Sequence, residues 1–378
     1  MKRFVTLFLA LVMIAGCLAG CGGKKKDETP ADANTPANTE APKTDFPKKD
    51  IEIDVCYSAG GTADTANRAL ASIMGEYLGV KINVVNVTGG SGSIAGQQVM
   101  GAKHDGYTWL GDVAHTASGW RVMDYADQSW EDWYGFYGAS APYVLFVAGS
   151  SPYTTYQELF DAMKADAGIK WGNAGFGSIN QLTGQLMLDI VGLKGTTVPY
   201  NGGREAAVKV IANEVVWSWA GISDVMDLAL SGDIRILGVC DSEPLAIDCA
   251  KGAYEAASML TDYPSLSTLE GLLFWGFRVP RDTPPEVVAR IQEAFEYAVE
   301  TDEFAKYCAD NALTPAPACG PESDEMCARL ESIYAWGLYD QDLAAEGISP
   351  EDFGIPRIED FKYPTNDRIA AINPWPDV

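Results

Sequence analysis

The chain has little histidine and few basic residues, and both shortages exclude functions. Only His104 and His115 are histidines, and no two cysteines are spaced as CxxC. A metal centre is therefore not expected, because structural zinc needs clustered cysteine and histidine ligands. Lys and Arg total 27 against 52 Asp and Glu, which leaves a net charge of −25. Nucleic acid is excluded as a partner, because it binds to basic surfaces.

Long apolar runs are absent after the first twenty residues. A basic start and an apolar stretch over Phe4–Ala19 are typical of a signal peptide, which is too short to span a bilayer. The small residues before Cys21 resemble a bacterial lipoprotein processing box, so residues 1–20 would be removed and Cys21 lipidated, with Cys17 as the alternative site. Residues 21–50 are polar and predict a disordered tether. We expect a lipoprotein anchored at the outer face of the cytoplasmic membrane or in the periplasm.

Six cysteines would remain in the mature protein. An even number in an exported chain favours disulfides, whose connectivity the sequence leaves open. A Cys240–Cys249 bond would close a short loop, as would a pair among the last three, whereas Cys56 could be a buried thiol in a strand. The six are Cys56, Cys240, Cys249, Cys308, Cys319 and Cys327.

Two glycine-rich turns lie close together, at Ser58–Arg68 and Asn86–Gly96. Each follows a β-rich run and opens a helix-like one. A strand that ends in glycines at the start of a helix directs unpaired N–H groups and the positive end of the helix dipole toward one point. Such a site binds anions, and two in succession in an exported chain indicate a receptor for a small anion.

Strand and helix patterns alternate through most of the remaining chain. Helices are predicted over Thr65–Leu78, Ile94–Gly101 and Pro284–Glu300, with a strand over Tyr143–Ala148. This alternation indicates mostly parallel sheets flanked by helices, and the length suffices for two α/β domains. The end of the chain, Ser349–Val378, is proline-rich and is predicted to be irregular.

Taken in order, several turns carry a family resemblance. They are Gly60-Gly61-Thr62-Ala63-Asp64 with Arg68, Asn86 with Gly89–Ser93, His104–Thr108, Gly175-Phe176-Gly177-Ser178, and Val198-Pro199-Tyr200-Asn201-Gly202. With these motifs the chain resembles the substrate-binding receptors of tripartite tricarboxylate transporters, the Bug family. Two positions depart from the family pattern: Asn180-Gln181 replaces a common histidine, and Asn201 a common lysine. These departures argue against citrate as the ligand.

The resemblance implies a two-lobed, type II periplasmic-binding-protein-like α/β fold with the ligand cleft between the lobes. Lobe 1 would comprise residues 51–148 and 273–378, and lobe 2 residues 149–272. The lobes would close like a hinge around a small organic carboxylate. The receptor would deliver it to the permease subunits in the membrane. On this reading the protein is no enzyme, uses no cofactor and is a monomer.

The expected ligand-binding residues come from loops of both lobes. From lobe 1 we expect Tyr57, Ser58, Ala59, Gly60, Gly61, Thr62, Asp64, Gly89, Gly90, Ser91, Gly92 and Ser93. From lobe 2 we expect Phe176, Gly177, Ser178, Asn180, Tyr200, Trp219 and Ala220.

Some of these residues also have a purely structural interpretation. The hydroxyls of Thr62, Ser91 and Ser93 could cap helices. The Asp64 carboxylate could stabilise a helix, because it would lie near the positive end of the helix dipole. One of Trp217 and Trp219 is expected to face the opposite side of the strand from the other, and core packing is favoured for Trp217. His115 is expected to face solvent.

A dinucleotide-binding oxidoreductase is the competing hypothesis. Gly90, Gly92 and Ala95 fit G-x-G-x-x-A between a strand and a helix, and Asp112 follows at the distance expected for a ribose-binding acid. This hypothesis leaves the first glycine-rich turn unexplained. Hydrolysis is not favoured, because no nucleophile–His–acid set is evident.

Overall fold

The computed structural model describes residues 44–363 and 374–376. The predicted signal peptide, Cys21 and most of the predicted tether lie outside the described residues. Within the described part, no helix is both long and apolar enough to cross a membrane.

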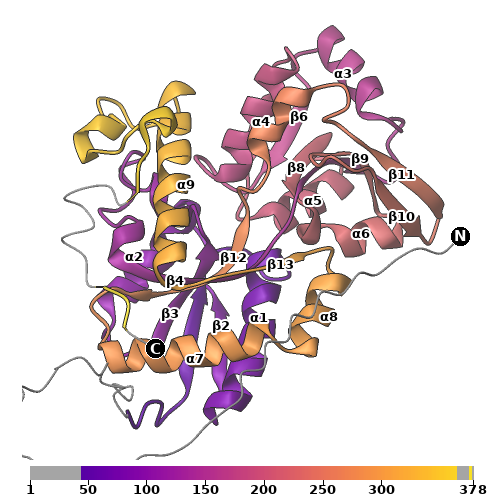
Figure 1. Cartoon of the computed structure of the whole chain (residues 1–378). Coiled ribbons are helices and arrows are strands. Elements are labelled where there is room, and N and C mark those ends of the chain that lie inside the picture. The colour runs from indigo at the N-terminus through magenta and orange to yellow at the C-terminus, as the bar shows by residue number, and fades with distance from the viewer. Residues whose placement is uncertain (1–43, 364–373, 377–378) are drawn as a thin grey trace, which may run out of the picture. The chain divides into compact units, whose positions relative to one another are not determined.

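The strands form two sheets (Figure 1). The first sheet has the order β13-β4-β12-β3-β1-β2 and contains β1 (Ile51–Val55), β2 (Ile82–Asn86), β3 (Thr108–Val113), β4 (Trp133–Ser140), β12 (Phe274–Pro280) and β13 (Thr314–Ala318). The second has the order β10-β11-β9-β5-β8-β6-β7 and contains β5 (Tyr143–Ala148), β6 (Lys170–Asn173), β7 (Thr196–Pro199), β8 (Trp217–Gly221), β9 (Ile234–Val239), β10 (Leu245–Cys249) and β11 (Gly252–Ser258).

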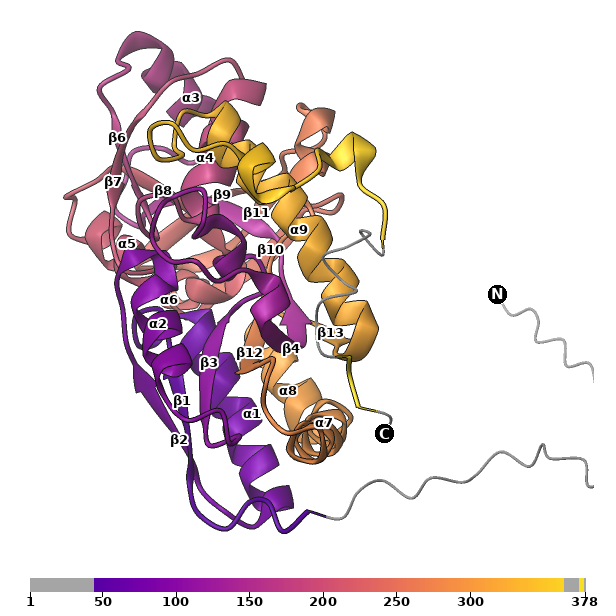
Figure 2. The same ribbon diagram turned by 90° about the vertical axis from the view of Figure 1, so that its left-hand side faces the viewer.

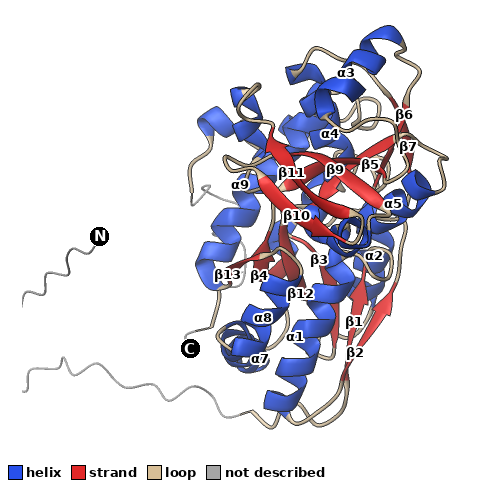
Figure 3. Cartoon of the chain, turned by 90° about the vertical axis from the view of Figure 1, so that its right-hand side faces the viewer, coloured by secondary structure: helices blue, strands red, loops and turns tan. Residues whose placement is uncertain are grey.

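Helices pack against both sheets (Figure 3). They are α1 (Thr62–Leu78), α2 (Ser93–Gly101), α3 (Tyr156–Ala165), α4 (Ile179–Ile190), α5 (Gly203–Ile211), α6 (Met226–Ser231), α7 (Pro285–Val299), α8 (Asp302–Asp310) and α9 (Gly320–Asp340). Helix α1 contacts β1, β2, β3 and β12, α2 contacts β1 and β3, and α5 contacts β5, β6, β8 and β9. The α/β architecture expected from the alternating pattern is confirmed.

The expectation of mostly parallel strands is wrong in detail, because both sheets are mixed. Strands β1, β2 and β3 pair in parallel, as do β6, β7 and β8, whereas β12 is antiparallel to β3 and β4, and β5 is antiparallel to β8 and β9. The chain passes between the sheets at Ala141-Pro142 and again through residues 259–273. Strands β5 and β12 thus receive the chain from the other sheet, so no crossover helix sets their direction. The sequence patterns did not predict strands β4, β10, β11 and β13.

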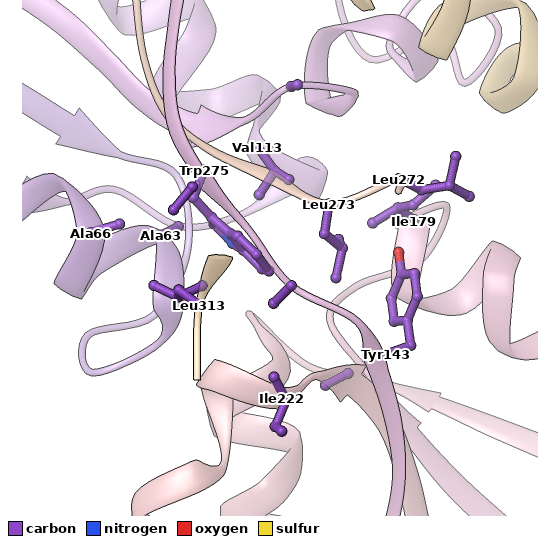
Figure 4. Close-up of a cluster of buried hydrophobic side chains, with 14 of the residues drawn as sticks. Ala63, Ala66, Val113, Tyr143, Ile179, Ile222, Leu272, Leu273, Trp275 and Leu313 are labelled. Carbon is purple, nitrogen blue, oxygen red and sulfur yellow. The ribbon is translucent and has the colours of Figure 1, made fainter. Parts of the chain in front are cut away.

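Apolar side chains fill the space between the two sheets (Figure 4). Val113 and Trp275 come from the first sheet, and Tyr143 and Ile222 from the second sheet and the turn that follows it. The Trp275 ring approaches the backbone of Gly221 so closely that an added Cβ would lie 3.0 Å from it. Packing therefore holds the last residue of β8 beside the start of β12.

The expected disulfides are not formed. All six cysteines of the described part are free, and Cys56, Cys240, Cys308 and Cys327 are buried. The thiols have other neighbours: Cys240 Sγ lies 3.4 Å from the Leu266 carbonyl, and Cys249 Sγ lies 3.1 Å from the Gly252 carbonyl. The alternative interpretation of Cys56 as a core thiol is confirmed.

Short 3-10 turns over Pro350–Phe353 and Ile358–Asp360 are the regular structure of the described tail, as its proline content predicts. Trp375 lies against Tyr134 with ring centroids 4.9 Å apart, and its Nε1 donates to Asp324 Oδ2 at 3.0 Å. The described segment 374–376 thereby packs against β4 of the first sheet (Figure 2).

A buried carboxyl in β1 makes folding sensitive to pH. Asp54 is fully buried, and its Oδ2 accepts a hydrogen bond from Gln98 Nε2 at 2.8 Å. Its Oδ1 has no partner among the described residues. Burial, helped by the charge of Glu52, raises the pKa of Asp54 to about 6. The folded state therefore holds the proton more tightly than the unfolded chain, where the pKa is about 3.9.

We predict that Asp54→Asn stabilises the protein above pH 6 by about 1–2 kcal/mol, because the neutral amide keeps the Gln98 contact without a buried charge. Urea unfolding at pH 8 and pH 4 measures this gain. The gain should shrink at pH 4, where the wild-type carboxyl is mostly protonated in the folded state. Glu76→Gln, at an exposed position on α1, is the control. An equal effect of Asp54→Asn at both pH values would contradict the prediction.

Candidate functional site

The two glycine-rich turns follow neighbouring parallel strands and open at the same edge of the first sheet. They face turns that follow β6 and β7 in the second sheet. Between them lies a cavity of about 390 Å³. Its lining includes these predicted site residues: Tyr57, Gly89, Gly90, Ser91, Gly92, Phe176 and Tyr200. Cys56, Tyr125, Ala174, Gly175, Pro199, Asn201 and Glu205 complete the lining.

The second turn has a backbone shape that requires glycine. Gly92 has φ 93°, and an added Cβ would lie 2.6 Å from Thr116 Cγ2. Trp120 Nε1 donates to the Ser91 carbonyl at 3.1 Å and holds the turn in place. Helix α2 begins at Ser93, directly after Gly92 of the cavity lining, so the positive end of its dipole lies near that edge of the cavity. Neither Ser91 nor Ser93 caps the helix through its side chain.

The first turn is held together by Asp64. Its Oδ2 accepts from the Gly60 N–H at 2.9 Å, and its Oδ1 accepts from Arg68 Nε and Asn86 Nδ2, both at 3.0 Å. Burial disfavours the charged form, but these donors prevail and hold the pKa of Asp64 below its usual value. Asp64 thus joins the first turn to α1 and β2, and it does not line the cavity.

An acid that the motif analysis missed lies at the start of α1. Asp224 follows β8 and is buried, and its Oδ1 accepts from the Thr62 N–H at 2.7 Å and from Thr62 Oγ1 at 2.8 Å. Thr62 Oγ1 also lies 2.7 Å from Ser223 Oγ. The sequence shows only an acidic residue just after a predicted strand. That pattern alone does not indicate which residue the acid will contact.

Further hydrogen bonds connect the turns of the two sheets. Ser91 Oγ donates to the Phe176 carbonyl at 2.7 Å, and the Ser58 N–H donates to the Asn201 carbonyl at 3.1 Å. The hydroxyl of Tyr334, on α9, donates to the Gly177 carbonyl. The predicted first-sheet and second-sheet turns are therefore in direct contact.

A second, much smaller cavity of about 30 Å³ adjoins the first turn. Its lining includes Tyr57, Ser58, Gly61, Thr62 and Asn180 from the predicted set, together with Asp224 and Trp275. Neither cavity has the following predicted residues in its lining: Ala59, Gly60, Asp64, Ser93, Gly177, Ser178, Trp219 and Ala220.

Several of these residues have structural contacts instead. Ser178 Oγ accepts from the Gln181 N–H at 3.2 Å and caps α4. The expectation that Trp217 and Trp219 face opposite sides is wrong, because residues two apart on a strand share a face. Both indoles are fully buried. Trp219 stacks on Tyr143 with ring centroids 5.3 Å apart. Asn180 Nδ2 donates to the Trp219 carbonyl at 3.4 Å.

The expectation that His115 faces solvent is wrong. Its ring is buried, packs edge-on against Tyr334, and has its pKa lowered to about 3 by burial and by the charge of Arg278. Asp112 is also fully buried, and its Oδ2 lies 2.7 Å from Arg278 Nε. An acid in this ion pair cannot bind a ribose, so the oxidoreductase hypothesis loses one of its elements.

The fold and the cavity define a class of protein: a two-sheet α/β protein with a cavity between the turns of its two sheets. Residues 66–326 match the tripartite tricarboxylate transporter family receptor, TctC, and the chain belongs to this family. A protein of Cupriavidus necator, described as UPF0065 protein in gbd 5'region, is 25% identical over 295 residues, which cover 75% of this chain and 84% of that protein.

Solved structures share the fold. The periplasmic binding protein BugD superposes with a TM-score of 0.69 at 20% identity, over 79% of this chain and 99% of that chain. MatC from Rhodopseudomonas palustris, with bound malate, superposes with a TM-score of 0.64 at 19% identity, over 79% of this chain and 99% of that chain. Rpa4515 from R. palustris, with adipate, superposes with a TM-score of 0.65 at 21% identity, over 79% of this chain and 98% of that chain. Of these three structures, BugD is described as a periplasmic binding protein, and the other two are described with a bound carboxylate.

We predict that Thr62→Val destabilises the folded protein by about 1–2 kcal/mol, because it removes the hydroxyl donor to the buried Asp224 carboxyl. The urea midpoint measures the loss. Thr196→Val, at an exposed position in β7, makes the same change without this contact and should leave the midpoint in place. Equal midpoints for both variants would show that the Thr62–Asp224 contact does not stabilise the folded state.

Proposed function

We propose that the protein is an extracytoplasmic receptor that captures a small organic carboxylate between two lobes and delivers it to a membrane permease. The main support is the cavity that the second glycine-rich turn and the start of α2 share with the turns after β6 and β7. A carboxylate there would gain hydrogen bonds from backbone N–H groups. The family membership, and the malate and adipate of the structures of similar fold, support the same ligand class.

Capture would proceed by hinge closure. We assign residues 51–148 and 273–378 to lobe 1 and residues 149–272 to lobe 2. Two features support this. Apart from β5 (Tyr143–Ala148), which pairs in the second sheet although it falls in the lobe 1 range, each sheet draws its strands from one of these sets, and the chain passes between the sheets only twice within the described range. Bonds such as Ser91 to Phe176 would form as the lobes close.

Anchoring and delivery complete the proposal. The signal-like start and Cys21 support a lipidated protein held at the outer face of the membrane, tethered by the polar segment to residue 50. The closed, liganded receptor would be recognised by the permease subunits. The receptor itself would act as a monomer, with neither catalysis nor a cofactor.

Thermal-shift measurement with a panel of carboxylates tests the proposal on the protein lacking residues 1–21. A ligand at about a hundredfold its Kd should add about 2.7 kcal/mol of stability. We predict that Gly92→Ala abolishes this shift, because the added Cβ would displace the turn from Thr116. Gly101→Ala, where an added Cβ has open space, should keep it.

Circular dichroism would establish that both glycine variants fold. A shift with NAD and with no carboxylate would overturn the receptor proposal in favour of a dinucleotide-binding protein. A carboxylate shift that survives Gly92→Ala would place the ligand away from the second turn.

A further inference from the structure

Asp224 makes the contacts that a ligand carboxylate would be expected to make at the first glycine-rich turn. Its Oδ1 accepts from the backbone N–H and the hydroxyl of Thr62, the first residue of α1. These are the donors that anions bind at helix N-termini. Asp224 belongs to the segment after β8, so an acid of the second sheet occupies the anion site of the first.

The other carboxylate oxygen lies at the start of a second helix. An added Cβ on Gly203, the first residue of α5, would lie 2.2 Å from Asp224 Oδ2. A side chain at position 203 would therefore expel the carboxylate, and glycine admits it. The positive ends of α1 and α5 both favour an anion between them. Burial raises the pKa of Asp224, while the Thr62 donors and the charge of Arg204 oppose that rise.

The space left beside Asp224 is too small for a second carboxylate. The cavity that it lines has a volume of about 30 Å³, about the share of one water molecule in the liquid. The ligand must therefore lie in the adjoining cavity of about 390 Å³. Only one edge of that cavity, at Gly89–Gly92, has a helix start that can receive a carboxylate from the first sheet.

The larger cavity has no positive side chain to receive a second carboxylate. Lys, Arg and His are absent from its described lining, whose one charged residue is Glu205. The Glu205 carboxylate already accepts from the N–H and the side-chain amide of Asn201, both at 3.0 Å. A second ligand carboxylate would meet like charge in a partly buried site, which is unfavourable. The rings of Tyr57, Tyr125, Phe176 and Tyr200 offer surface for an apolar or aromatic body instead.

We propose that Asp224 is a specificity-determining residue: by occupying the start of α1 with its own carboxyl group, it restricts the receptor to monocarboxylates with an apolar or aromatic body. This inference rests on the proposed carboxylate-receptor function. Dicarboxylates and tricarboxylates are rejected because the first anion site is taken and no cation replaces it.

Calorimetric titration of ligand pairs that differ by one carboxylate tests the inference. Hexanoate against adipate and benzoate against terephthalate are suitable pairs, used with the protein lacking residues 1–21. We expect the wild-type protein to bind at least one monocarboxylate ten-fold or more tightly than its dicarboxylate partner. In Asp224→Ala, which empties the start of α1, this preference should fall ten-fold or more.

Asp227→Asn is the matched control, because it removes a carboxylate three residues away on a side chain that is 66% exposed and pairs with Arg204. It should keep the wild-type preference. Asp224→Asn retains an oxygen that can accept from Thr62 and fills the same space, so it should fold and keep the preference even if the alanine variant does not fold. A folded Asp224→Asn that loses the preference would contradict occupation of this place as its cause.

The outcomes separate the two proposals. A wild-type protein that binds adipate or terephthalate as tightly as its monocarboxylate partner overturns the inference and leaves the receptor function standing. A preference that persists in Asp224→Ala shows that another residue sets it. A wild-type protein that binds neither member of any pair counts against the receptor function itself.

Discussion

The close packing of the two sheets is the constraint on which the site depends. Trp275 from β12 lies against Gly221 at the end of β8, where a side chain would meet the indole ring. This contact brings the segment after β8 to the start of α1, so that Asp224 reaches Thr62. The polar contacts across the cleft therefore lie next to packed apolar side chains. These side chains exclude water, which strengthens the hydrogen bonds. Without this packing, the glycine-rich turns would lose their contacts with the turns of the second sheet.

The parts of the site that follow from local backbone chemistry were predictable. The strands before the two glycine-rich turns, the helices after them and the αL residue Gly79 that ends α1 each have a signal within a few residues. The placement of Phe176 and Tyr200 beside the cavity followed from family motifs, not from periodicity. The mixed direction of the strands was missed, because passage between two sheets leaves no local pattern.

Partners distant in the chain were not predictable in this way. Thr62 and Asp224 are separated by 162 residues, and Asp112 finds Arg278 in the core. An isolated polar residue between apolar neighbours does not reveal whether it will face solvent or a buried partner, which is why His115 was misplaced. The even number of cysteines misled for the same reason: pairing depends on proximity in the fold, and four of the six thiols are buried in the core.

Every strand of the second sheet comes from one uninterrupted stretch, from β5 to β11, whereas the first sheet is assembled from segments on both sides of it. This arrangement gives the two halves unequal evolutionary freedom. The second-sheet stretch is joined to the rest at only two points along the described chain, so recombination could exchange it whole while the first sheet kept its strand order. Asp224, Phe176 and Tyr200 would be exchanged together in such an event. The turns at Gly60 and Gly92 would stay with the first sheet.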